Sequence, residues 1–245
     1  GTSSNPCRSL NRRCRHRVIG SFRNVTMVTQ GIAAATLRPS NEALPVGDQA
    51  KRASMTRIVI IDGHPDPSPE RFVHGLAGTY ADAARERGHE VERIEIAKLD
   101  FPVLRSQAQW QDGPVPQDIE HAQQAILRAQ HLVILYPLWL GDIPALLKAF
   151  LEQVARPSFA FRYKEKGLPE KLLRGRSARV IVTMGMPGLF YRFFYRAHSL
   201  KSLERNILGF TGIAPIRHSV IGGVESAERR ERWLSRIRDL GLRAL

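Results

Sequence analysis

The chain has 245 residues, of which 43% are hydrophobic, enough for one substantial α/β domain with a single core. Its two cysteines, Cys7 and Cys14, both lie near the N-terminus. This placement excludes a disulfide scaffold or a cysteine-bound metal in the core and favours a reducing, cytoplasmic location. No apolar run approaches the roughly 18 residues of a membrane-spanning helix.

The net charge of +14 is unevenly distributed. Residues 1–54 carry nine Lys or Arg and two acidic residues, whereas residues 55–245 carry 28 and 21. The larger part therefore has an ordinary basic surface, which favours anionic ligands. No nucleic-acid-binding motif accompanies the charge, so we expect no nucleic-acid partner.

Residues 1–54 are rich in Arg and Ser and show no sustained helix or strand period. Three interpretations fit them: a targeting peptide, a disordered basic arm for an acidic partner, or non-native sequence ahead of a true start near Met55. We therefore assign the fold to residues 55–245 and treat residues 1–54 as a disordered basic tail or a non-native extension.

The first structural signal is the apolar run 58–61, which predicts a strand buried on both faces. It breaks into loop one, Gly63–Arg71, which contains three prolines and a serine. A helix is expected over 72–88, with Gly88 as its C-terminal stop. A loop between a strand and a helix start directs backbone N–H groups at an anionic phosphate, so a nucleotide-like cofactor is expected.

The same alternation continues to the end of the chain. It predicts a polar loop at 101–116, a solvated loop at 164–176, strands at 89–96, 132–136, 178–183 and 215–221, and helices at 117–130, 143–154, 200–208 and 227–245. Five strands alternating with helices predict an α/β, flavodoxin-like three-layer sandwich with a five-stranded parallel sheet in order 2-1-3-4-5. Ligands bind such sheets at the carboxyl ends of the first and third strands.

Two further loops leave the same edge of the predicted sheet: loop two, Tyr136–Ala145, and loop three, Thr183–Gly188. Loop one suits the phosphate of a flavin mononucleotide. Loop two offers an apolar and aromatic surface for the flavin ring. The glycines of loop three let the backbone approach a ligand closely, and its N–H groups suit negative charge on the ring.

These loops carry a resemblance over residues 57–245 to the flavodoxin-fold NAD(P)H:quinone oxidoreductases. It rests on G-H-P-D-P in loop one, P-L-W-L-G-D-I-P-A-L-L-K from loop two onward, and T-M-G-M-P in loop three. The resemblance implies a homodimer that binds FMN or FAD and passes hydride from NAD(P)H to a quinone, nitro or azo acceptor. It assigns cofactor binding to His64, Ser68, Arg71, Phe72, Pro137, Leu138, Trp139, Leu140, Thr183, Gly185 and Met186, and catalysis to Tyr191 and His198.

The chain departs from the family pattern at four places. Loop two has Leu140 and Gly141 where the family often has further aromatics, and Met184 and Met186 intervene in the T-G-G pattern of loop three. Arg71, Phe72 and Val73 stand where the family has Ser-Phe-Asn, so an arginine replaces a hydroxyl at the phosphate. The spacing between Tyr191 and His198 is one residue longer than in the family. The aromatic and basic stretch 189–198 fits a subunit interface best, with a membrane-surface segment or a nucleotide-stacking site as alternatives.

Two functions compete with an enzyme. One is a flavin-binding regulatory subunit with little turnover, for instance of a potassium-efflux system, and the other is a basic binding module driven by residues 1–54. For an enzyme we expect ping-pong kinetics, because donor and acceptor would use one shallow flavin face in turn. No metal constellation and no Ser/His/Asp or Cys/His set is evident, so no metal site is predicted. The sequence leaves the preference between NADH and NADPH open.

Overall fold

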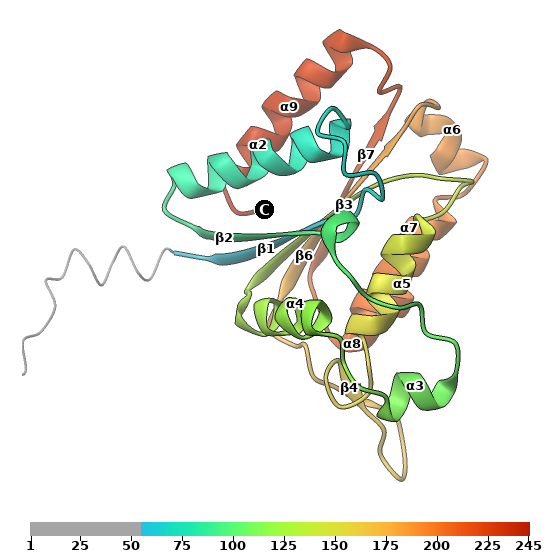
Figure 1. Cartoon of the computed structure of the whole chain (residues 1–245). Coiled ribbons are helices and arrows are strands. Elements are labelled where there is room, and N and C mark those ends of the chain that lie inside the picture. The colour runs from blue at the N-terminus through green and yellow to red at the C-terminus, as the bar shows by residue number, and fades with distance from the viewer. Residues whose placement is uncertain (1–54) are drawn as a thin grey trace, which may run out of the picture. The chain divides into compact units, whose positions relative to one another are not determined.

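The computed structural model describes residues 55–245, and the predictions made for residues 1–54 lie outside this range. Five parallel strands form one sheet in the order β2-β1-β3-β6-β7 (Figure 1). Counted along the sheet, this is the predicted 2-1-3-4-5 order, and the fold class is confirmed. The strands are β1 (Arg57–Asp62), β2 (Glu90–Glu95), β3 (His131–Pro137), β6 (Ser177–Met184) and β7 (Ile216–Gly222).

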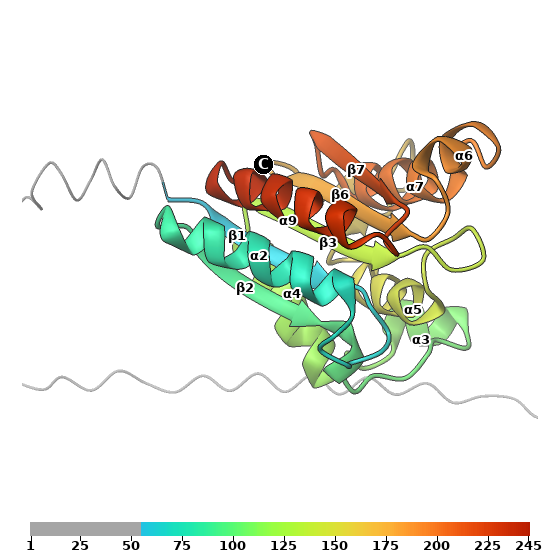
Figure 2. The ribbon, with the colours of Figure 1, turned by 90° about the horizontal axis from the view of Figure 1, so that it is seen from above.

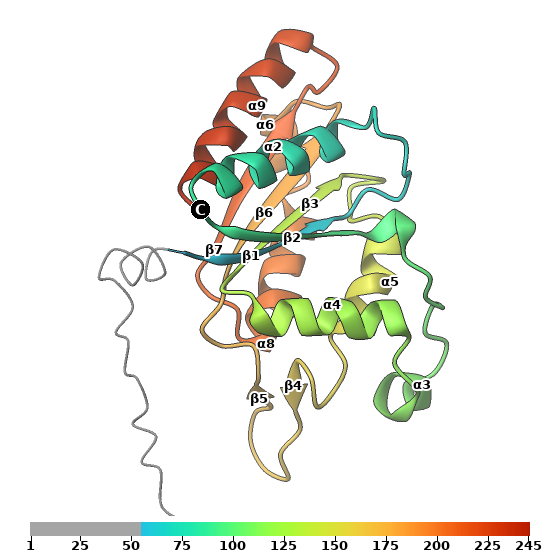
Figure 3. The ribbon, with the colours of Figure 1, turned by 60° about the vertical axis from the view of Figure 1, so that its left-hand side comes forward.

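Helices cover both faces of the sheet, as a parallel sheet requires. One face carries α2 (Phe72–Glu86) and α9 (Ala227–Leu242), which lie side by side (Figure 2). The opposite face carries α4 (Gln117–Arg128) and α5 (Ala145–Val154) (Figure 3). The sheet is thus the middle layer of a three-layer sandwich.

Side chains of successive strand residues enter different cores, which explains the unbroken apolar runs. Ile58 and Ile60 of β1 pack beneath α2 and α9, whereas Val59 and Ile61 pack beneath α4 and α5. All four are at most 2% exposed. A strand buried on both faces cannot alternate apolar with polar residues, so its sequence is continuously apolar.

The glycine stop of α2 is confirmed. Gly88 has φ 83°, a left-handed conformation that glycine adopts without steric cost. Its N–H donates to the Arg85 carbonyl over 2.9 Å, and the His89 N–H donates to the Ala84 carbonyl over 3.1 Å. These paired bonds form a Schellman motif, so the helix proper ends at Glu86, just before the glycine.

Short elements account for the differences from prediction, because segments of two to six residues are too short to show a clear period. The predicted loop 101–116 contains α3 (Gln107–Asp112), and the second strand of a small hairpin, Glu170–Lys171, lies within the predicted loop 164–176. The remaining elements are η1 (Ile96–Lys98), β4 (Phe161–Arg162), β5 (Glu170–Lys171), α6 (Gly188–Phe193), α7 (His198–Ser202), the π-helical turn η2 (Leu203–Leu208) and α8 (Gly209–Thr211). Within residues 55–245, no helix has the length and apolar character needed to cross a membrane.

His131, at the start of β3, makes the stability of the fold depend on pH. Burial, aided by the positive charges of Arg179 and Arg217, lowers the pKa of His131 to about 4. The unfolded chain, with a histidine pKa of about 6.5, therefore binds a proton that the folded chain excludes. As pH falls from about 6.5 to about 4, we expect this group to remove up to about 3 kcal/mol from the free energy of unfolding.

Urea unfolding at several pH values in this window tests the prediction. His131→Gln should flatten the pH dependence, whereas His121→Gln, on the exposed surface of α4, should leave it unchanged. Equal pH slopes for the wild type and His131→Gln would contradict it.

Candidate functional site

Loops one, two and three follow β1, β3 and β6, which are neighbours in the sheet. Because these strands are parallel, the loops leave the same edge (Figure 1). Backbone hydrogen bonds tie loop one to β3 and loop two to loop three: Gly63 N–H donates to the Leu135 carbonyl over 2.7 Å, and Leu138 N–H donates to the Thr183 carbonyl over 2.8 Å. The structure therefore brings together the three segments that the sequence singled out.

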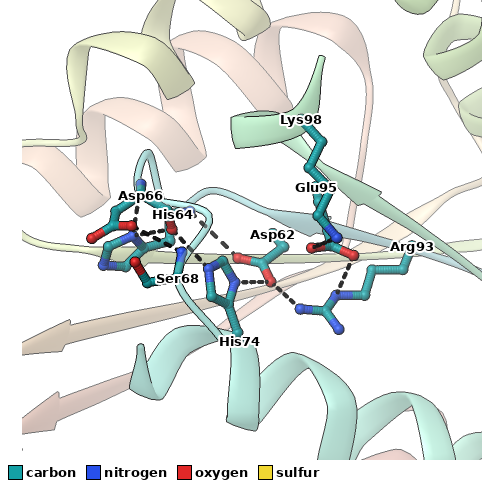
Figure 4. Close-up of polar contacts among 8 residues, drawn as sticks. All are labelled: Asp62, His64, Asp66, Ser68, His74, Arg93, Glu95 and Lys98. Carbon is teal, nitrogen blue, oxygen red and sulfur yellow. Dashed lines mark hydrogen bonds and ion pairs between the residues drawn. The ribbon is translucent and has the colours of Figure 1, made fainter. Parts of the chain in front are cut away.

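A buried ionic network lies beneath loop one (Figure 4). Asp62, the last residue of β1, is fully buried, and its Oδ2 accepts from His74 Nδ1 over 2.7 Å and from the Arg93 guanidinium over 2.6 Å. His74 Nε2 also donates to the Asp66 carbonyl oxygen over 2.9 Å. The network thus ties β1, β2 and α2 to the middle of loop one. An uncompensated carboxylate at this depth would be strongly destabilising.

The network continues toward solvent along β2. Arg93 Nε lies 3.9 Å from Glu95, and Glu95 pairs with Lys98 over 2.8 Å (Figure 4). This arrangement was not predicted from the sequence. One signal was readable, since Asp62 is a charged residue directly after the apolar run 58–61.

Asp66 supplies loop one with an anion of its own. Its Oδ1 accepts from the Ser68 N–H over 2.9 Å, and its Oδ2 accepts from Arg71 Nε over 2.7 Å. Hydrogen bonds from Ser68, then from Arg71, hold the pKa of Asp66 well below its usual range. Ser68 and Arg71 thus lie in loop one as predicted, but they contact this carboxylate, so a phosphate would share them with Asp66 or displace it.

His64 links loop one to loop two. Its Nδ1 accepts from the Asp66 N–H over 3.0 Å, and its ring meets the Trp139 ring edge-on with 6.1 Å between centroids. Burial, and then the neighbouring His74, lower the pKa of His64. This imidazole therefore orders the loop backbone and supports the aromatic side chain of loop two.

The N-terminus of α2 offers free backbone donors. Arg71 is the N-cap residue, and no side chain caps this end. Within residues 55–245, the N–H groups of Phe72 and Val73 have no hydrogen-bond partner. The Phe72 side chain is half-buried and packs against the core beneath α2. Free N–H groups at the positive end of a helix dipole, beside a hydroxyl and a guanidinium, fit a phosphate.

Loop two turns back on itself at Leu140 and Gly141. These residues have φ values of 49° and 80°, and Trp139 and Asp142 exchange backbone hydrogen bonds of 2.9 Å. The geometry is that of a type I′ turn. Leu140 bears a conformational cost of about 1 kcal/mol there and is fully exposed at the apex.

The rest of loop two forms the predicted apolar surface. Pro137 and Leu138 are half-buried, and Trp139 is 48% exposed. A half-exposed indole beside an ordered imidazole offers a planar surface to an aromatic ring. Loop two therefore fits the ring of a flavin.

Loop three is exposed to solvent at Gly185. Thr183 is buried, Met186 is half-buried and Gly185 is exposed. Glu225, which follows β7, approaches Gly185 so closely that a β-carbon there would lie 3.2 Å from its Oε1. Glu225 was not predicted as a site residue, because no local sequence pattern marks it. A carboxylate can accept hydrogen bonds but repels negative charge, so Glu225 disfavours the negative charge that loop three was expected to favour.

The two predicted catalytic residues differ in exposure. Tyr191 is fully buried, and its hydroxyl lies 2.7 Å from Ser199 Oγ and accepts from the Leu200 N–H over 3.2 Å. The Tyr191 hydroxyl is thus engaged within the protein, and its catalytic role stays a prediction. His198 is exposed, its Nδ1 donates to the Tyr195 carbonyl over 2.9 Å, and its catalytic role stays a prediction.

The chemistry open to this site is that of a bound organic cofactor. Within the described range 55–245, no group of three or more His, Cys, Asp or Glu side chains is placed to hold a metal ion. The loops instead provide backbone donors, an arginine and an aromatic surface. Such an arrangement positions a ligand that carries the reaction itself.

Comparison with known proteins bears on the fold and the site. A family model described as "Flavodoxin-like fold" matches residues 56–240. An "Uncharacterized NAD(P)H oxidoreductase" of Haemophilus influenzae is 26% identical over 178 residues, 71% of this chain and 87% of that protein. "FMN-dependent NADH:quinone oxidoreductase 2" of Listeria innocua is 27% identical over 201 residues, 72% of this chain and 92% of that protein. The solved structure of an NAD(P)H:quinone oxidoreductase from Methanothermobacter marburgensis shares the fold, with a TM-score of 0.66 at 24% identity, over 78% of this chain and 100% of that one.

Proposed function

This chain belongs to the flavodoxin-like family, and from this premise we propose that residues 55–245 bind FMN and use NADH or NADPH to reduce a quinone-like acceptor. One observation carries the proposal: loop one, the uncapped N-terminus of α2 and the half-exposed Trp139 meet at one edge of the sheet. The names of both relatives support nicotinamide chemistry, and the name of the Listeria relative also supports flavin chemistry. We propose FMN rather than FAD because the name of the Listeria relative specifies FMN.

Each loop has a role in the proposal. In loop one, Ser68, Arg71 and the first N–H groups of α2 hold the phosphate, and His64 orders the loop around it. In loop two, Pro137–Leu140 pack against the ring. In loop three, the backbone of Thr183, Gly185 and Met186 faces its polar edge. When bound, the flavin supplies the capacity to accept and donate hydride.

The proposal extends to assembly and location. α6 and the residue after it present exposed apolar side chains, with Leu189, Phe193 and Phe194 at 68%, 78% and 69% exposure. An apolar patch of this kind supports a homodimer interface. Quinone, nitro and azo compounds are the proposed acceptors. A cytoplasmic location belongs to the proposal as well, because residues 55–245 contain no cysteine.

Binding and turnover together test the function. Purified protein should bind FMN, gain thermal stability at saturating FMN, and oxidise NADH or NADPH with a small quinone in ping-pong kinetics. Absence of both binding and stabilisation would contradict the flavin site. Tight binding with negligible turnover would identify a flavin-binding regulatory subunit instead.

Trp139→Ala should lower turnover by on the order of 10²-fold at saturating FMN, because hydride transfer depends on close alignment of the reacting rings. Trp139→Phe keeps an aromatic surface and should restore much of the rate. Steady-state kinetics with excess FMN measure the effect. Unchanged turnover in Trp139→Ala would remove loop two from the proposed ring site.

A further inference from the structure

A second pocket adjoins loop three at one border of the sheet. It has a volume of about 570 Å³ and is formed by α6, β7 and the first turns of α9. Gly188, the last residue of loop three, lines it and packs closely against Val220 and Gly222 of β7. β7 is the edge strand of the sheet next to β6, so this pocket lies to one side of the proposed flavin site, which is formed by the loops after β1, β3 and β6. We call it the arginine pocket.

Positive charge dominates the walls of the arginine pocket. Arg192 comes from α6, and Arg229, Arg232 and Arg236 come from α9, where their spacing places them along one face. No carboxylate lines the pocket. Within residues 55–245, none of these four guanidinium groups forms a salt bridge. Like charges on one helix face repel each other and destabilise the folded protein, and a bound anionic ligand would reduce this repulsion.

Two of the four arginines are held in place by the protein. One Nη of Arg229 donates to the Gly222 carbonyl over 3.2 Å. The guanidinium carbon of Arg236 lies 5.1 Å from the centre of the Trp233 ring, a cation–π arrangement. A guanidinium that is already positioned loses less conformational entropy when it binds an anion.

We propose that the arginine pocket binds the 2′-phosphorylated adenosine end of NADPH, and that the protein therefore prefers NADPH to NADH. This inference rests on the proposed function. The two nucleotides differ by the 2′-phosphate, and planar guanidinium groups hold a phosphate with paired, charge-assisted hydrogen bonds. The pocket volume lies within the roughly 300–1,000 Å³ of small-molecule sites, and Gly188 joins it to loop three.

Direct binding tests the pocket without flavin or turnover. Calorimetry with adenosine 2′,5′-bisphosphate and with adenosine 5′-monophosphate should show at least about tenfold tighter binding of the bisphosphate. Arg232→Ala and Arg236→Ala should remove that advantage. Arg230→Ala, an exposed arginine of α9 outside the pocket, is the matched control and should retain it.

Kinetics then connect the pocket to the reaction. In the wild type, kcat/KM should be at least about tenfold higher for NADPH than for NADH. Arg232→Ala should raise KM for NADPH by a similar factor and leave kcat and the NADH parameters unchanged. Arg230→Ala should match the wild type with both nucleotides.

The outcomes separate this inference from the proposed function. Equal binding of the two adenosine phosphates, or equal effects of Arg232→Ala on NADPH and NADH, would overturn the arginine pocket while flavin-dependent turnover stood. Selective bisphosphate binding that is lost in Arg232→Ala would support the pocket even if no turnover were found, and the proposed reaction alone would then fail.

Discussion

Asp62→Ala should lower the free energy of unfolding by about 3–5 kcal/mol, the usual cost of removing one partner from a buried ion pair. The substitution leaves the 7%-exposed His74 and the 25%-exposed Arg93 without their shared carboxylate. It also loosens loop one, because His74 then lacks the contact that aligns it with the Asp66 carbonyl. We therefore expect a weaker affinity for FMN in the same variant.

Urea unfolding and flavin titration measure the two effects. Glu92→Ala is the matched control, since its salt bridge to Arg128 is exposed and should contribute at most about 1 kcal/mol. Riboflavin, which lacks the phosphate, should lose less affinity than FMN in Asp62→Ala. A loss of stability no greater than that of Glu92→Ala would show that the buried network is dispensable.

Gly222→Ala should destabilise the protein by about 3 kcal/mol and disturb loop three, because the new methyl group has no room. A β-carbon at Gly222 would clash with the Gly188 backbone nitrogen and lie 2.6 Å from the Met186 carbonyl oxygen. Both are backbone atoms, which cannot rotate away as a side chain can. Loop three must shift as a unit, so affinity for flavin should fall together with stability.

Gly78→Ala is the control for this prediction. A β-carbon at Gly78 meets nothing within 4 Å, and the residue lies inside α2. Alanine should therefore stabilise the helix by about 1 kcal/mol. Thermal unfolding and FMN titration compare the two variants. A Gly222→Ala protein with wild-type stability and affinity would show that loop three tolerates movement against β7.

Asp66 makes phosphate binding at loop one conditional. Its carboxylate already accepts from Ser68 and Arg71, the side chains expected to hold the phosphate. A phosphate gains those bonds only as Asp66 gives them up, whereas the N–H groups of Phe72 and Val73 need no exchange. The backbone N–H groups at the N-terminus of α2 can therefore bind an anion without losing another contact, whereas Arg71 must first release Asp66.

The sequence alone determined the layered α/β fold and the edge on which a ligand site forms. Strands buried on both faces must be continuously apolar, as at 58–61, and Gly88 permits a helix stop that other residues resist. Once strands alternate with helices, right-handed parallel connections place the loops after β1, β3 and β6 at one edge. These are consequences of local pattern and general topology, so one sequence suffices to infer them.

Only the tertiary structure decided which side chains meet at that edge. Asp62 pairs with His74 and Arg93 because strand register and helix packing bring three separate elements together. The same packing buries the Tyr191 hydroxyl, brings Glu225 to Gly185 and gathers the arginines of α6 and α9 around one pocket. Such contacts join residues far apart in the chain, and their free energies depend on burial and distance. Local periodicity in the sequence reveals neither the burial of these residues nor the distances between them, so the partners could not be predicted from the sequence.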